Sequence, residues 1–202
     1  MENLVLHMKE PIPGLNAMLR AAGSPRRGTL AGMKLDIQKS VALATLRALG
    51  DAKTLPWASH PMKVVRERAE AFAAEKRGRR SSAVKGILEK VKRERSADEE
   101  ARQSKKKSAS RIAPEERPVV IITSYRPRPL EDDDYVGGGK FHVDALRYIG
   151  LILDDKQAAA VIRYADQEQC HRDDSMTRIA ISRVEHAEKC EACGYVIPLH
   201  QV

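Results

Sequence analysis

The chain has 202 residues, 42% of them hydrophobic, 4% aromatic and 32% charged, a balance that permits one domain with a modest core and a long solvated part. Its formal net charge of +8 favours a polyanionic partner such as nucleic acid. Because no apolar run approaches the roughly 20 residues of a membrane-spanning helix, no signal-peptide pattern is found and three cysteines are too few for a disulfide framework, we expect a cytoplasmic protein with no membrane partner.

Two regular elements are predicted before residue 57. The loosely alternating stretch Asn3–Met8 predicts a β-strand. Leu30–Gly50 carries apolar residues at helical spacing and closes on a glycine, which predicts a helix with one buried face. The only tryptophan, Trp57, follows this helix. We expect it to pack in the interior, and stacking on an exposed DNA base is the alternative.

The composition changes at residues 57–111. Between Lys63 and Lys107 sixteen Lys and Arg oppose eight Asp and Glu, a surplus that equals the net charge of the whole chain. The apolar residues there are too sparse for an independent core, so we expect a solvated pair of charged helices followed by a flexible linker. A basic insert of this kind is suited to contact with the phosphates of DNA.

A strand-rich block follows the insert. The β-branched stretch Arg117–Tyr125 predicts a strand, residues 126–139 a loop, and Lys140–Ile152 a helix. Residues 158–167 and 177–186 predict two further strands, which the polar residues between them join as a hairpin. This order of elements predicts an α+β domain, with helices packed on a small mixed β-sheet.

Six aspartates crowd into the segment of residues 130–156. Like charges at this density repel one another, and a bound cation would relieve the repulsion. Asp132 and Asp134 lie two apart in a segment expected to be extended, so their side chains can leave the same face. Asp154 and Asp155 follow the predicted helix. If the two pairs converge, their oxygens suit Mg²⁺ or Mn²⁺, whereas solvated turns are the competing explanation.

Basic residues near the acids are candidates for the same site. Lys140 can stabilise the charge that develops on phosphorus or on the leaving oxygen. Arg126 and Arg128 can position phosphates, and charge balance for the loop is their competing role. His142 follows Lys140 by two residues, and we expect it at the surface or in the core rather than in the site.

The segment DDDYVGGGKFHVDALRYIGLILDDK resembles the signature of the RusA-type crossover junction endodeoxyribonucleases, a family of Holliday junction resolvases. That signature consists of two acids separated by one residue and followed by Asn, then a lysine, an Asp-Ala-Leu element, a glycine and a closing Asp-Asp pair. The resemblance extends well over Arg117–His186 and weakly over Met1–Gly50. The matching residues are Asp132, Asp134, Lys140, Asp144, Gly150, Asp154 and Asp155.

The resemblance implies a homodimer that binds four-way DNA junctions and cuts them symmetrically with Mg²⁺, in a bacterial or phage-infected host cell. It implies that Asp132, Asp134 and Asp155 bind the metal, with Asp154 as a further candidate, and that Lys140 is needed for cleavage. We expect no small-molecule cofactor. The RusA-like nuclease domain would comprise residues 1–56 and 112–186, with a basic helical insert at 57–111 and a tail at 187–202.

Two departures from the signature favour an alternative function. Tyr135 stands where the family has Asn, and the VGGG stretch separates Lys140 from Asp134 more widely than in the compact form of the motif. The alternative is a non-catalytic nucleic-acid-binding protein that retains the fold with a degenerate site.

The C-terminal tail carries half of a zinc signature. Cys190 and Cys193 form a CxxC pair flanked by His186 and His200, and thiolates with imidazoles suit tetrahedral Zn²⁺. Two ordinary reduced cysteines are the competing interpretation. A zinc-stabilised module that recruits a partner is a third candidate function. Further candidate zinc ligands are Cys170 and His171.

Overall fold

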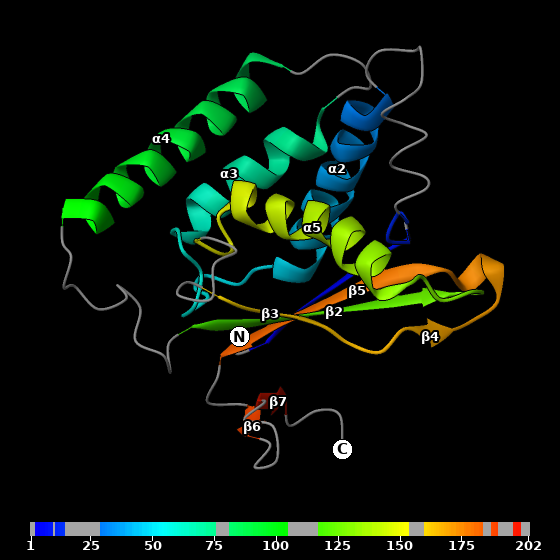
Figure 1. Cartoon of the computed structure of the whole chain (residues 1–202). Helices are drawn as coiled ribbons and strands as arrows, with labels where there is room; N and C mark the ends of the chain where they lie inside the picture. Colours follow the sequence, from blue (N-terminus) through cyan, green and yellow to red (C-terminus); the bar gives the residue numbers. More distant parts are fainter. Residues whose placement is uncertain are drawn as a thin grey trace.

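The computed structural model describes residues 3–9, 11–14, 29–75, 81–104, 117–153, 160–183, 187–189 and 196–198. Helices lie on one side of a β-sheet, with α5 along the sheet and α4 at the outer edge of the molecule (Figure 1). The expected α+β class is therefore confirmed. The helices are α2 (Thr29–Leu49), α3 (Met62–Ala73), α4 (Ser82–Ser104) and α5 (Asp132–Ile149), with a short 3₁₀ turn, η2, at Arg172–Asp174. The strands are β1 (Leu4–Met8), β2 (Pro118–Arg126), β3 (Val161–Tyr164), β4 (Glu168–Gln169), β5 (Met176–Arg183), β6 (Ala187–Lys189) and β7 (Val196–Pro198).

The main sheet is mixed and has the order β1-β5-β2-β3, with β4 pairing along the end of β2. Strand β2 runs antiparallel to β5 and parallel to β3, so Val120 lies between Ile181 and Ile162. Every second residue of these strands faces the helices, and this row forms the floor of the hydrophobic core. Strand β2 is buried over its first seven residues, which its run of β-branched residues favours.

The expected hairpin between the last two strands of this sheet is wrong. Strands β3 and β5 do not pair, because β2 lies between them. Helix α5 is the crossover of a β-α-β unit, which places β3 parallel to β2 on one side. The chain then passes the end of β2, where β4 and η2 lie, and returns as β5 on the other side of β2. The central strand is thereby paired along both edges.

The charged segment that follows Trp57 contributes to the same core as the rest of the chain. Helix α3 buries Val65, Ala69 and Phe72, and the ring of Phe72 stacks on Tyr148 of α5 with 6.3 Å between centroids. The expectation of a solvated helix pair is therefore wrong for α3. Its apolar residues are few, but they share one face and complete a core supplied mainly by other elements. Trp57 is buried in this core, as expected.

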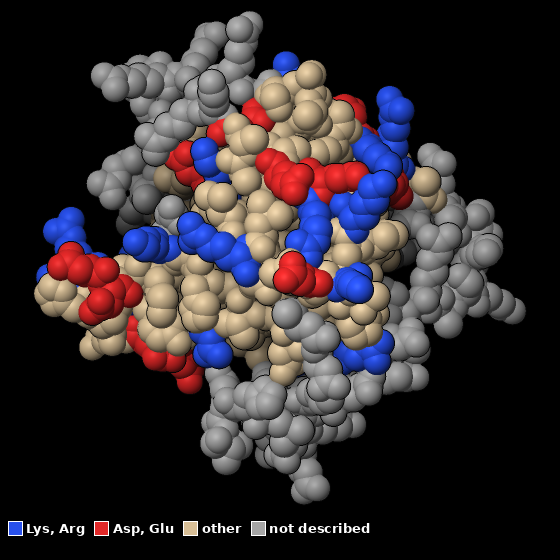
Figure 2. All heavy atoms as spheres, turned by 180° about the vertical axis from the view of Figure 1, so that it is seen from behind, with Lys and Arg blue, Asp and Glu red and all other residues tan. Residues whose placement is uncertain are grey.

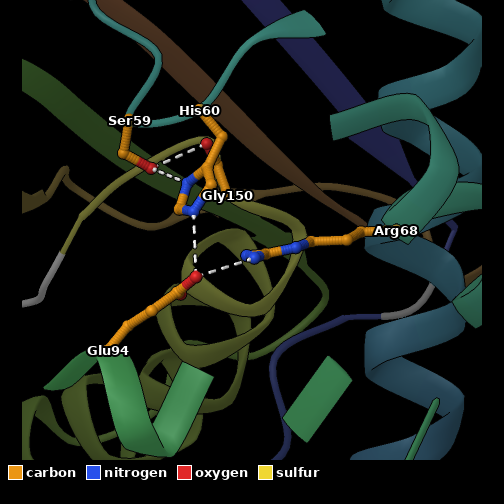
Figure 3. A network of polar contacts seen from close by, with 5 residues as sticks. All are labelled: Ser59, His60, Arg68, Glu94 and Gly150. Carbon is orange, nitrogen blue, oxygen red and sulfur yellow. Dashed lines mark hydrogen bonds and ion pairs between the residues drawn. The ribbon is translucent and has the colours of Figure 1, made fainter. Parts of the chain in front are cut away.

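A polar cluster joins α3 and α4 to the end of α5 (Figure 3). The Arg68 side chain is only 4% exposed, and its Nη2 lies 3.3 Å from Glu94 Oε1 on α4. His60 Nε2 lies 3.6 Å from the same oxygen. The Ser59 hydroxyl donates to the carbonyl of Gly150, the residue directly after α5, over 2.8 Å. We call Ser59, His60, Arg68 and Glu94 the Glu94 cluster.

The Glu94 cluster is built around a charge that needs a partner. A buried guanidinium is costly unless it is paired and hydrogen-bonded, so Glu94 fixes the position of α4 relative to α3. Burial and the neighbouring Arg68 lower the pKa of His60, while Glu94 partly opposes them. The Glu94 carboxylate lies nearer to Arg68, which is always charged, than to His60.

We predict that Glu94→Gln lowers the free energy of unfolding by about 1–3 kcal/mol, because it leaves the buried Arg68 without its carboxylate. Glu89→Gln is the matched control on the same helix, since Glu89 pairs only with the exposed Lys92 among the described contacts, and it should change stability by less than about 0.5 kcal/mol. Urea denaturation of the two variants measures the difference. Equal losses would show that Glu94 is an ordinary surface acid.

Candidate functional site

The acidic segment begins a helix rather than filling a loop. Helix α5 starts at Asp132, after Glu131 as its N-cap, and the Tyr135 amide donates to the Glu131 carbonyl over 2.9 Å. Acids in a first turn interact favourably with the exposed amides and the dipole of the helix, which partly offsets their mutual repulsion. The loop expected over residues 126–139 is therefore wrong from Asp132 onward. The loop is confined to residues 127–131, before α5, where the prolines at 127 and 129 disfavour a helix.

This helical start separates the two acids of the signature. Residues two apart on a helix point about 200° from each other, so Asp132 and Asp134 leave different sides of α5. Asp132 is exposed, whereas Asp134 is half-buried. The expectation that both leave the same face is wrong, because it assumed an extended backbone.

Asp134 faces the segment that follows β1. A Cβ added at Gly14 would lie 3.4 Å from Asp134 Oδ2. Arg126, at the end of β2, donates from Nη1 to the Ile12 carbonyl over 3.1 Å. Burial lowers the pKa of Arg126, and the carboxylate of Asp134 partly opposes this shift. Nη1 of Arg126 is thus used in a contact that stabilises the fold. Arg128, in contrast, is exposed.

Tyr135, which stands where the RusA-type signature has Asn, faces inward. It is buried, and its hydroxyl donates to the Ile122 carbonyl of β2 over 2.7 Å. Its ring meets Tyr164 of β3 edge to face, with 5.3 Å between centroids. Burial raises the pKa of Tyr135 well above its ordinary value. This residue therefore anchors α5 to the sheet and does not face a ligand in solvent.

The glycines of the VGGG stretch lie inside α5 and allow it to pack closely. A Cβ on Gly138 would collide with the Pro13 carbonyl oxygen, and one on Gly139 with the Tyr164 ring. The stretch is therefore not a spacer that could fold away, so Lys140 stays at its helical position. Six residues along a helix correspond to a rise of about 9 Å and a rotation of about 240°, which places Lys140 on a different side of α5 from Asp134. Lys140 is exposed.

The second half of the proposed metal site, Asp154 and Asp155, lies outside the described residues. Leu153 follows the C-terminal end of α5 and Ala160 precedes β3, whereas Asp132 lies at the other end of the helix. Eighteen helical residues span about 27 Å. Within the described part of the chain, no group of three or more His, Cys, Asp or Glu is placed to hold a metal ion.

The candidate zinc ligands of the tail, His186, Cys190, Cys193 and His200, also lie outside the described residues. Cys170 is half-buried, and His171 is exposed at the start of η2, where its side chain caps the turn. Oδ2 of Asp173 lies 3.6 Å from Nδ1 of His171. Zinc binding by the tail stays a prediction.

The interpretation of the sequence missed the Glu94 cluster. A signal for it exists on α3, where Arg68 falls on the apolar face made by Val65, Ala69 and Phe72. An arginine at such a position has to find an acid. Which acid it finds depends on the packing of α4, and no local pattern shows that.

Comparison with known proteins adds nothing to these observations. No family model matches the chain, and no match was found among curated proteins or solved structures. No helix in the described part is both long and apolar enough to cross a membrane. The interpretation of the site therefore depends on its residues and their geometry.

We predict that Gly138→Ala destabilises the protein by several kcal/mol or prevents folding, because the added methyl group has no room beside the Pro13 carbonyl. Gly86→Ala is the matched control, since Gly86 is also a helical glycine but has open space around it. The control should gain about 0.5–1 kcal/mol from helix propensity. Thermal unfolding of both variants gives the comparison, and a stable Gly138→Ala protein would contradict the close approach.

We predict an acid-dependent loss of stability that originates at His142. This side chain is 1% exposed, as expected for a core histidine, and its burial lowers its pKa from 6.5 to about 4. The folded state therefore binds the proton more weakly than the unfolded chain, so stability is lost as the pH falls from 6.5 toward 4. The loss amounts to about 2 kcal/mol between pH 7 and pH 5. Denaturation at both pH values should show this loss in the wild type and a smaller one in His142→Leu, and equal losses would contradict it.

Proposed function

We propose that the protein is a Mg²⁺-dependent endodeoxyribonuclease that acts as a homodimer on four-way or other branched DNA. The observation that carries the proposal is the acidic first turn of α5, which directly follows the central strand and coincides with the acids of the RusA-type signature. The exposed Arg128 precedes this turn, and the exposed Lys140 lies further along the same helix. Arg128 and Lys140 are therefore both accessible to a phosphate backbone.

In this proposal the carboxylates of Asp132, Asp134 and Asp155 hold the metal, with Asp154 as a further candidate. When bound, Mg²⁺ would activate water and neutralise the charge that develops at phosphorus. Of the described acids in this set, Asp132 is exposed, whereas Asp134 is half-buried beside Gly14 and Arg126. Arg128 would position the phosphate and Lys140 would stabilise the leaving oxygen.

A non-catalytic protein that binds nucleic acid with the same fold is the second candidate. Two observations favour it. Asp134 leaves a different side of α5 from Asp132 and Lys140, and the described residues alone do not gather three metal ligands. Such a protein would still bind DNA in a salt-dependent way, but no divalent cation would cause cleavage.

We predict that the purified 202-residue chain cuts a labelled synthetic four-way junction when Mg²⁺ is added. Asp134→Asn should lower the rate of cutting by at least 100-fold while junction binding persists. Cleavage is followed on denaturing gels and binding by fluorescence anisotropy. Asp133→Asn is the matched control, because Asp133 is an exposed acid of the same turn that has no counterpart among the acids of the signature. It should retain cleavage.

The outcomes separate the two candidates. Cutting by Asp134→Asn at the wild-type rate would overturn the assignment of the site. Junction binding by the wild type without any Mg²⁺- or Mn²⁺-dependent cutting would favour the non-catalytic protein.

A further inference from the structure

Helix α4 lies at the outer edge of the molecule (Figure 1) and carries exposed basic side chains. Val84 and Val91 are buried on its inner side. Seen from behind the view of Figure 1, the molecule shows interspersed basic and acidic side chains and no large area of one sign (Figure 2). On α4 the charges are sorted differently. The exposed basic residues of its described part are Lys85, Lys90, Lys92 and Arg93.

The two acids among the described side chains of α4 are both engaged. Glu94 turns inward to Arg68 and His60 in the Glu94 cluster (Figure 3). Glu89 pairs with Lys92 over 3.0 Å. The described outer face therefore carries a surplus of three positive charges, from Lys85, Lys90 and Arg93. Burial of the two valines and pairing of Glu94 with the buried Arg68 prevent the helix from turning this face inward.

A surface of this kind fits a polyanion with discrete phosphates better than a lipid surface. A helix that lies in a membrane interface needs a free apolar face, and that of α4 is packed against the core. Among the described residues the one large hydrophobic side chain that is exposed is Val136, which lies on α5. The outer face of α4 thus offers charge without an apolar anchor.

We propose that α4 binds the phosphate backbone of duplex DNA through Lys85, Lys90 and Arg93, and so holds an arm of the branched substrate. The choice of DNA as partner rests on the proposed function. From residue 85 to residue 93 the helix rises about 12 Å. A duplex carries one phosphate charge per 1.7 Å of its axis, or about seven charges over that length. Contacts of this type are independent of base sequence, so α4 would contribute affinity for any arm.

The test measures how DNA affinity depends on salt. The triple variant Lys85→Gln, Lys90→Gln, Arg93→Gln is titrated against a labelled duplex and a four-way junction between about 50 and 200 mM salt. Each lost phosphate contact lowers the slope of log K against log salt by about 0.9, so we expect a slope smaller by about two to three. Thermal unfolding verifies that the variant is folded, which we expect because all three side chains are exposed.

Two matched controls isolate the contribution of α4. Glu89→Gln with Lys92→Gln removes an exposed ion pair from the same helix without changing the net charge, and should leave the slope unchanged. A remote triple variant, Arg47→Gln, Lys53→Gln, Arg172→Gln, removes the same number of exposed charges from other elements, and should change the slope by less than about one.

The outcomes test DNA binding by α4 whether or not the protein cuts DNA. A salt slope that falls equally in the α4 triple and the remote triple would overturn the proposal, even if junctions are cut. Wild-type protein that does not bind DNA would overturn it too, as would a triple variant that loses only its binding to vesicles containing phosphatidylserine. Selective loss in the α4 triple supports it, even if the wild type binds DNA and does not cut it.

Discussion

The close packing of α5 against the sheet and the segment after β1 is the constraint on which the candidate site depends. Gly138 and Gly139 allow this approach, since side chains there would collide with Pro13 and Tyr164. The hydroxyl of Tyr135 then secures the helix to Ile122 of the central strand. Because the helix is held by its own interior residues, the acids in its first turn and Lys140 on its outer side have little freedom to rearrange.

Much of the fold could be predicted because its elements have strong local patterns. The strands at Asn3–Met8 and Arg117–Tyr125 and the helix at Leu30–Gly50 are confirmed within one residue at each end. Gly50 follows α2 with positive φ, as its position indicates, whereas Gly150, also with positive φ, ends α5 three residues before the expected end at Ile152. The partners of the strands could not be predicted in this way, since β2 pairs on both sides with segments that follow it by dozens of residues.

The start of α5 was misjudged for a physical reason. Three glycines in succession disfavour a helix by roughly 1 kcal/mol each, so local propensity predicts a loop. Tertiary packing reverses this, because two of these positions accept no side chain. The same error affected the prediction that Asp132 and Asp134 leave one face of the chain. A resemblance indicates which residues correspond, but the directions of Asp132, Asp134 and Lys140 follow from the backbone that carries them.

The molecule has two distinct charged regions. The acids at the start of α5 are candidates for binding a cation, and the basic outer face of α4 is suited to phosphates. The Glu94 cluster fixes α4 and contacts the end of α5 that lies opposite to the acids. In the proposed nuclease, the outer face of α4 would hold DNA and the start of α5 would cut it.

In the proposed function, Asp134 and Asp155 belong to one divalent-metal site. Titration calorimetry with Mn²⁺ in the absence of DNA tests this most directly, with Asp133→Asn as the reference variant. We expect a binding site in the wild type and in Asp133→Asn whose affinity for Mn²⁺ is at least tenfold weaker in both Asp134→Asn and Asp155→Asn. Wild-type affinity in either of these two variants would contradict it.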